Sequence, residues 1–122
     1  MELSYIPCIA YPAGESKHGP IRVIEDDYPV FFIAPKDSTR KHINGNIMEI
    51  KARGAEIYTV GTEGDDELKE LSDWWLGHPN VHEILSPMTY VIPFQLLAYH
   101  LAVEKGYDPD KPRNLAKRVT VQ

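Results

Sequence analysis

Residues 29–34 read Pro29-Val30-Phe31-Phe32-Ile33-Ala34, a run without a single charged or polar side chain. A strand with one face in water alternates apolar and polar residues, whereas a strand covered on both faces is apolar throughout. The run therefore predicts a buried strand in a mostly parallel sheet with helices on both faces. This is the α/β class, and the segments around the run support it.

A helix is expected over residues 38–53, because Ser38 can cap its first turn and Gly54 can end it. Its apolar residues fall at i, i+4 and i+7, which places them on one helix face: Ile43, Ile47 and Ile50.

The rest of the chain continues the alternation with short connections. After this helix we expect a strand over residues 55–60, a helix over 64–75, a strand over 81–85 and a helix from Pro87 to about Lys105. Before the run, residues 5–11 read as a short strand, 12–20 as a loop and 21–24 as one helical turn. The order β-α-β-α-β-α after residue 28 implies one domain with a mostly parallel sheet.

Composition argues against several classes of function. The 122-residue chain has a formal net charge of −5, whereas nucleic-acid binding needs a basic face. Cys8 is the only cysteine, so no internal disulfide is expected and a reducing cytoplasm is the expected location. The longest apolar stretch, residues 88–103, is too short and too polar to span a membrane. No nucleic-acid or membrane partner is therefore expected.

Two motifs resemble ligand-binding sites, but a structural role explains each of them better. His78 and His82 have the spacing of zinc ligands on a helix, but Pro79 and Asn80 interrupt any helix there and no third ligand is apparent, so no metal is expected. Residues 61–66 form a glycine loop after a strand, but their acids would repel phosphate. We interpret them as a helix start with acids at its positive end.

The loop Gly14-Glu15-Ser16-Lys17-His18-Gly19-Pro20 is a candidate site, because glycines let a backbone approach a ligand closely. It follows an expected strand, where open α/β sheets tend to bind ligands. His18 can move a proton near neutral pH. The alternative is a solvated loop with an ordinary surface histidine.

The tail, residues 107–122, is the second candidate. The Asp108-Pro109-Asp110-Lys111-Pro112 segment cannot continue a helix, and the apolar residues after it could dock the end of the chain. A docked tail would hold Lys117 at a fixed point, where it could act as a nucleophile. The alternative is a surface lysine on a frayed terminus.

These candidates also carry a resemblance. Four motifs occur in order: residues 13–20, Ala52-Arg53-Gly54, residues 93–100 and residues 110–117. Over essentially its whole length the chain resembles the C-terminal part of glutamine–fructose-6-phosphate aminotransferase (isomerizing), also called glucosamine-6-phosphate synthase. The resemblance implies a flavodoxin-like sugar isomerase (SIS) domain that binds a sugar phosphate of the fructose 6-phosphate or glucosamine 6-phosphate class.

The resemblance also implies roles for individual residues. Lys117 would form a Schiff base with the open-chain keto sugar, and Glu2 would move a proton between C1 and C2. His18 would assist ring opening across a dimer interface, and Ala116 would lie beside the sugar. The glycine loop would contribute further substrate contacts from Gly14, Glu15 and Lys17. No cofactor is implied.

The chain departs from the family by being partial. The glutaminase domain and the first SIS domain, with its phosphate-binding loop, are not in this sequence, and the first strand and helix of the second SIS domain would precede Glu2. Residues 1–122 are therefore interpreted as a single partial SIS domain, a four-strand remnant with exposed apolar surface. A homodimer, or a complex with an upstream SIS and glutaminase chain, would cover that surface.

Three interpretations remain open. The chain could be the isomerase portion of a split or truncated enzyme that is active only with a partner, which Glu2, His18 and Lys117 favour. It could be a non-catalytic phosphosugar-binding or assembly module, which the missing phosphate loop favours. It could also be an inert fragment of a longer gene.

Overall fold

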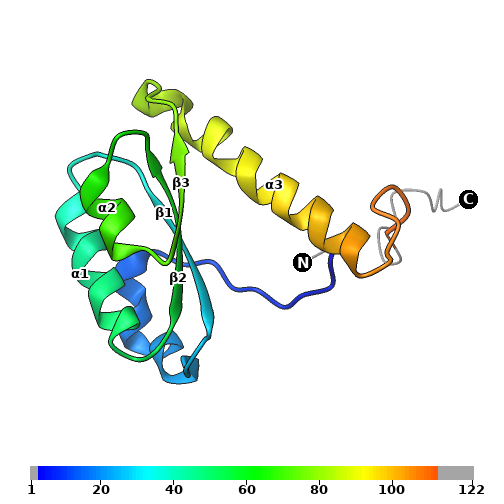
Figure 1. The fold of residues 1–122 in the computed structure, drawn as a ribbon, viewed down its shortest axis with the longest axis horizontal. Helices are drawn as coiled ribbons and strands as arrows, with labels where there is room; N and C mark the ends of the chain where they lie inside the picture. Colours follow the sequence, from blue (N-terminus) through cyan, green and yellow to red (C-terminus); the bar gives the residue numbers. More distant parts are fainter. Residues whose placement is uncertain (1–2, 113–122) are drawn as a thin grey trace, which may run out of the picture. The chain divides into compact units, whose positions relative to one another are not determined.

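The computed structural model describes residues 3–112 of the chain, and Figure 1 shows their helices and strands. The chain divides into two compact units. Ala10–Ser86 form one unit, and the described residues of Met1–Ile9 and Pro87–Gln122 form the other. The larger unit contains the sheet.

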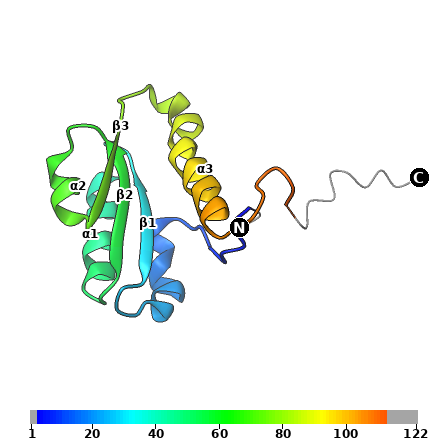
Figure 2. The same cartoon turned by 45° about the vertical axis from the view of Figure 1, so that its right-hand side comes forward.

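The sheet has three strands in the order β1-β2-β3: β1 (Pro29–Ala34), β2 (Glu56–Thr62) and β3 (Trp74–His78). Both neighbouring pairs are parallel, as Figure 2 shows. Phe32 of β1 lies opposite Thr59 of β2, which in turn lies opposite Trp75 of β3. The predicted α/β class with a parallel sheet is confirmed.

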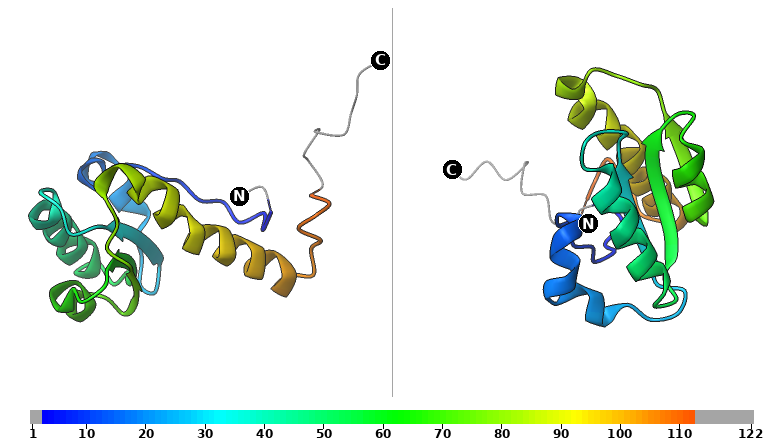
Figure 3. Two further views of the ribbon diagram at one scale, coloured as in Figure 1. Left: turned by 90° about the horizontal axis from the view of Figure 1, so that it is seen from above. Right: turned by 90° about the vertical axis from the view of Figure 1, so that its left-hand side faces the viewer.

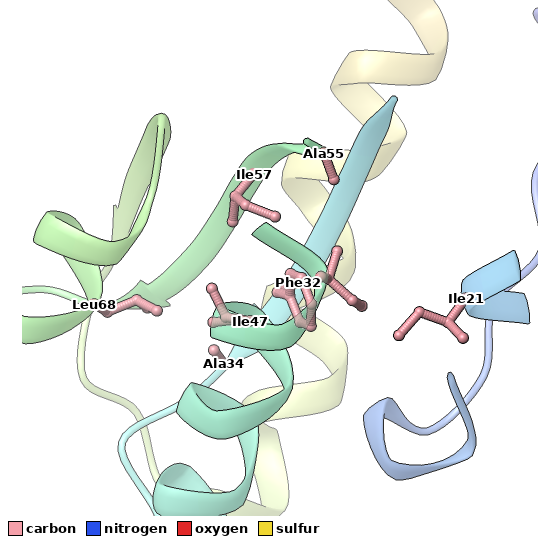
Figure 4. Packing of buried hydrophobic residues seen from close by; sticks show 8 residues of the cluster. Ile21, Phe32, Ala34, Ile47, Ala55, Ile57 and Leu68 are labelled. Atoms are coloured by element: carbon pink, nitrogen blue, oxygen red, sulfur yellow. The ribbon is translucent and has the colours of Figure 1, made fainter. Parts of the chain in front are cut away.

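Helices α1 (Arg40–Lys51) and α2 (Asp66–Leu71) pack on one face of this sheet. The right-hand view of Figure 3 shows α1 in front of the strands. The predicted stripe of α1 is confirmed, because Ile47 and Ile50 are fully buried and Ile43 packs against the same cluster. Figure 4 shows most of this core, whose buried members are Ile21, Phe32, Ala34, Ile47, Ile50, Ala55, Ile57 and Leu68.

The opposite face of the sheet is also apolar. Phe31 stacks on Tyr58 with ring centroids 4.7 Å apart, and Tyr58 stacks on Trp74 at 6.3 Å. The Glu56 carboxylate accepts hydrogen bonds from the Tyr58 hydroxyl (2.8 Å) and the Trp74 indole N–H (3.1 Å). Phe31 and Trp74 remain exposed, as do their neighbours Ile33 and Leu76 on the same face. Apolar and polar residues do not alternate along residues 29–34, because both faces of β1 are apolar.

A buried ion pair joins the ends of three elements. The Arg40 guanidinium, at the start of α1, donates to the Ala34 carbonyl oxygen (2.7 Å) at the end of β1 and pairs with the Asp65 carboxylate. Asp65 also accepts a hydrogen bond from the Leu68 backbone N–H (3.1 Å) and so caps α2. The interpretation of residues 61–66 as a helix start with acids at its positive end is therefore confirmed, and the cap by Asp65 is an additional finding.

Three local predictions are wrong. Residues 5–11 form no strand; Pro7 lacks the backbone N–H that a strand would need. The expected helix over residues 64–75 ends at Leu71, because Ser72 is extended and Asp73 accepts a hydrogen bond from the Ile57 backbone N–H (2.8 Å), which brings residues 74–78 beside β2. The expected strand over residues 81–85 is instead a short turn, η3 (Glu83–Leu85), where the His82 ring accepts from the Ile84 N–H. The four-strand expectation thus becomes three strands in the described residues.

The smaller unit contains all but the first residue of α3 (Ser86–Glu104), which includes Pro93. The rings of Tyr5 and Tyr107 meet edge to face with centroids 4.9 Å apart, which ties the beginning of the described chain to the segment after α3. Within residues 3–112, no helix combines the length and apolar character needed to cross a membrane.

Substituting Ile47 with Ala should lower the free energy of unfolding by about 2–5 kcal/mol, because it leaves a cavity between α1 and the sheet. Met48→Ala is the matched control, since Met48 is 55% exposed on the same helix and should cost less than about 0.5 kcal/mol. Urea denaturation followed by tryptophan fluorescence measures both. Equal costs for the two variants would contradict the packing described above.

Asp73 should make stability depend on pH. The backbone N–H of Ile57 and the Lys51 ammonium lower the pKa of Asp73, although partial burial opposes the shift. A lowered pKa in the folded state stabilises the fold above the unfolded pKa of about 3.9, and this contribution disappears as pH falls through the folded value. Asp73→Asn should therefore be less stable than the wild type at pH 7 and approach it as pH falls below about 4. A pH-independent difference in urea midpoint would contradict this.

Candidate functional site

The glycine loop forms two short 3₁₀ helices, η1 (Ala13–His18) and η2 (Pro20–Val23). Gly19 separates them with a φ of 149°, a conformation that side chains other than glycine rarely adopt. η1 packs against α1, and both lie in the larger unit (Figure 1). Loop residues 14–20 therefore have a defined structure that rests on the helix covering the sheet.

The side chains of this loop divide into an inner and an outer set. Ser16 and Ile21 are buried, and Ile21 belongs to the core cluster. The predicted site residues of the loop are all exposed on η1: Gly14, Glu15, Lys17 and His18. The loop thus presents an acid, an amine and an imidazole to solvent from one short helix.

Lys17 reaches across to α1. Its ammonium lies 2.8 Å from a carboxylate oxygen of Glu49, and both side chains are about half exposed. An open depression of about 570 Å³ lies beside this pair, and it is lined by Lys17, Ile21, Glu49, Ala52 and Arg53. Two cations and one carboxylate therefore surround a hollow whose remaining lining is aliphatic.

The turn after α1 fixes the backbone at Arg53. Its N–H donates to the Ile50 carbonyl oxygen at 3.1 Å, which continues the helical winding for one further residue. Gly54 has a φ of 88°, and a Cβ there would lie 2.0 Å from the Asp26 carboxylate oxygen. Within the described part of the chain, the Arg53 side chain makes no hydrogen bond or ion pair.

The structure places four of the seven predicted site residues together, on η1. Glu2, Ala116 and Lys117 lie outside the described residues. Sequence reasoning missed Glu49 and Arg53 as neighbours of Lys17. Ala52-Arg53-Gly54 was recognised as a motif, but no local pattern places it next to a loop more than thirty residues earlier.

The two histidines with zinc-like spacing have local hydrogen-bonding roles. A ring nitrogen of His78 lies 2.7 Å from the Pro79 carbonyl oxygen, and His82 caps η3. Among residues 3–112, no three His, Cys, Asp or Glu side chains are grouped to hold a metal ion.

The fold and the polar 3₁₀ loop define a small α/β domain with a parallel sheet and a surface hollow at the end of its first helix. A family model described as "SIS domain" matches residues 1–105. The chain belongs to the SIS domain family.

Particular relatives agree with this assignment. The chain is 48% identical over 121 residues to glutamine–fructose-6-phosphate aminotransferase [isomerizing] of Thermus thermophilus, covering 99% of this chain and 20% of that protein. The solved C-terminal domain of glucosamine-fructose-6-phosphate aminotransferase from Francisella tularensis superposes with a TM-score of 0.78 at 33% identity, over 87% of this chain and 30% of that one. The resemblance drawn from the motifs is confirmed, and the chain spans about a fifth of the length of the curated relatives it matches.

A second solved structure shows the same fold. Glucosamine-6-phosphate deaminase from Thermotoga maritima gives a TM-score of 0.70 at 26% identity, over 93% of this chain and 31% of that one.

The Lys17–Glu49 pair should contribute little to stability, because exposed ion pairs are typically worth about 0–1 kcal/mol. Glu49→Gln should therefore change the free energy of unfolding by less than about 1 kcal/mol, as measured by urea denaturation. A loss comparable with that of Ile47→Ala would show that the pair is a structural element, which would contradict this description.

Proposed function

We propose that this chain is the phosphosugar-binding and isomerase portion of an enzyme like glutamine–fructose-6-phosphate aminotransferase. The observation that carries the proposal is the grouping of Gly14, Glu15, Lys17 and His18 on η1, in a chain similar over 99% of its length to part of such an aminotransferase. The names of both solved neighbours contain hexose 6-phosphates, which supports a sugar phosphate as the ligand.

The proposed reaction converts a ketose phosphate into an aldose phosphate. His18 assists opening of the sugar ring, and an imidazole can exchange a proton near neutral pH. The Lys117 amine then attacks the keto carbon C2, and loss of water leaves an iminium. Ammonia, the co-reactant that an aminotransferase takes from an amino-group donor, then replaces Lys117 at C2, which frees the lysine and leaves a ketose imine. Glu2 removes a proton from C1 to give an enaminol, and a proton returns to C2, so that the released aldose carries an aldehyde at C1 and the amino group at C2.

We propose that this activity needs a second chain, either another copy or a chain carrying the upstream domains. Parallel sheets are normally covered on both faces, and Phe31, Ile33, Trp74 and Leu76 are exposed on one face of this sheet.

The exposed polar side chains of η1 also fit a second candidate, a non-catalytic phosphosugar-binding or assembly module. Such a module would bind the sugar phosphate through η1 without turnover.

Borohydride reduction in the presence of fructose 6-phosphate distinguishes the two candidates. If Lys117 forms the iminium, reduction should fix the sugar to that lysine, and mass spectrometry should find the adduct on the Lys117 peptide. Lys117→Arg should abolish both adduct and turnover, because arginine stays protonated and forms no Schiff base. Lys111→Arg is the matched control in the same segment and should retain both.

The assay should be repeated with the upstream domains supplied as a separate chain. Absence of an adduct at Lys117 under both conditions would reject the isomerase.

A further inference from the structure

One side of α3 carries an apolar stripe that is exposed along most of the helix. Five large apolar residues, each between 47% and 71% exposed, make up this α3 stripe: Met88, Ile92, Leu96, Tyr99 and Val103. Successive members are three or four residues apart, which places them on one side of a helix. Monomeric proteins rarely leave continuous apolar surface in water, so the stripe marks an interaction surface.

We propose that the α3 stripe binds the same stripe of a second copy of this chain, as an antiparallel pair of helices related by a two-fold axis. All five residues lie in the smaller unit, so this surface is distinct from the exposed sheet face of the larger one. A two-fold contact requires a self-complementary patch, because the same residues serve both copies. The inference does not depend on the proposed reaction.

The charge pattern of α3 favours a partner of the same kind. From Ser86 to Val103 the helix contains no Asp, Glu, Lys or Arg, and Tyr90 and Ala102 are buried. A helix on the surface of a domain normally carries charged residues on its solvent side, whereas a helix that is apolar on several sides is normally buried. Two copies of α3 can therefore meet without removing a charge from water, which is costly.

The spacing of the stripe suits a helix partner. Ile92, Leu96, Tyr99 and Val103 follow one another at intervals of four, three and four residues, the pattern of helices that pack side by side. In an antiparallel pair centred near Leu96, Ile92 of one copy lies opposite Tyr99 of the other, and Met88 lies opposite Val103. The antiparallel arrangement also opposes the two helix dipoles, so each negative helix end lies near a positive one.

The area of the stripe is that of a weak, reversible dimer. A large side chain buries roughly 150–250 Å² when it is fully covered. The exposed fractions of the five residues therefore amount to on the order of 500 Å² per copy, or about 1,000 Å² for a dimer, the lower limit of specific interfaces. Association should depend on protein concentration, and it should depend little on salt because no charge pair forms it.

Sedimentation velocity of the full chain over a range of protein concentrations tests the proposal. Leu96→Glu should raise the dissociation constant of the dimer by about tenfold or more, because it places an unpaired charge at the centre of the interface. Leu76→Glu is the matched control, since Leu76 is 49% exposed on the sheet face and Leu96 is 55% exposed on α3. This control should leave the dissociation constant unchanged.

Three results would overturn the proposal. The first is a wild-type chain that stays monomeric up to about 1 mM, where even weak complexes form. The second is a dimer that persists in Leu96→Glu or is also lost in Leu76→Glu. The third is a monomeric wild type that binds a chain carrying the upstream domains and loses that binding in Leu96→Glu, which would assign the stripe to a different partner.

Cysteine cross-linking tests the arrangement without adding a charge. In a Cys8→Ser background, which removes the only native thiol, Leu96→Cys should form a disulfide with its own copy, because the two positions meet at the centre of the pair. Met88→Cys is the control and should not, since its two copies lie near opposite ends of the pair. Equal cross-linking of both variants would overturn the antiparallel arrangement, and no cross-linking of Leu96→Cys would overturn the interface.

Discussion

Ile47 and Ile50 of α1 are buried in one cluster with Phe32 and Ile57 of the sheet, and this packing positions most of the larger unit. It fixes the rotation of α1 about its axis, so the residues on its flank face away from the strands. Glu49 on that flank is free to meet Lys17 of η1, and Ile21 of η2 joins the same core from the loop side. The depression exists because one helix packs on the sheet with one face and on the glycine loop with another.

The opposite face of the same sheet is also apolar, and its exposed side chains bear on assembly with a partner chain. Hydrogen bonds to Glu56 orient the rings of Tyr58 and Trp74, and Phe31 stacks on Tyr58, yet Phe31 and Trp74 remain exposed. Hydrogen bonding to Glu56 also raises the pKa of the Tyr58 hydroxyl, so the neutral ring is retained over a wider pH range. Apolar surface of this kind is normally covered, which links the fold to the proposed need for a partner chain.

Sequence patterns predicted those elements whose character is set locally. The unbroken run at residues 29–34 identified β1, and the spacing of Ile43, Ile47 and Ile50 identified the buried face of α1. The end of α2 was placed wrongly because Leu68, Leu71 and Trp75 continue a helical spacing across Ser72 and Asp73. The hydrogen bond from the Ile57 N–H to Asp73 is made across the fold, and it turns residues 74–78 into a strand.

Sequence patterns also predicted only that part of the site whose residues are close together in the chain. The glycine loop could be recognised from its composition, and the motif match placed the chain in a family that the comparisons confirm. The Lys17–Glu49 contact joins residues separated by 32 positions, and no local pattern encodes it. Arg53 lines the hollow beside this contact, and no local pattern encodes that either.

The most direct test of a ligand site on η1 is a crystal structure of the protein with fructose 6-phosphate. The proposed function predicts a sugar phosphate in contact with the exposed side chains of η1, among them His18. A sugar phosphate bound without any contact to η1 would contradict it.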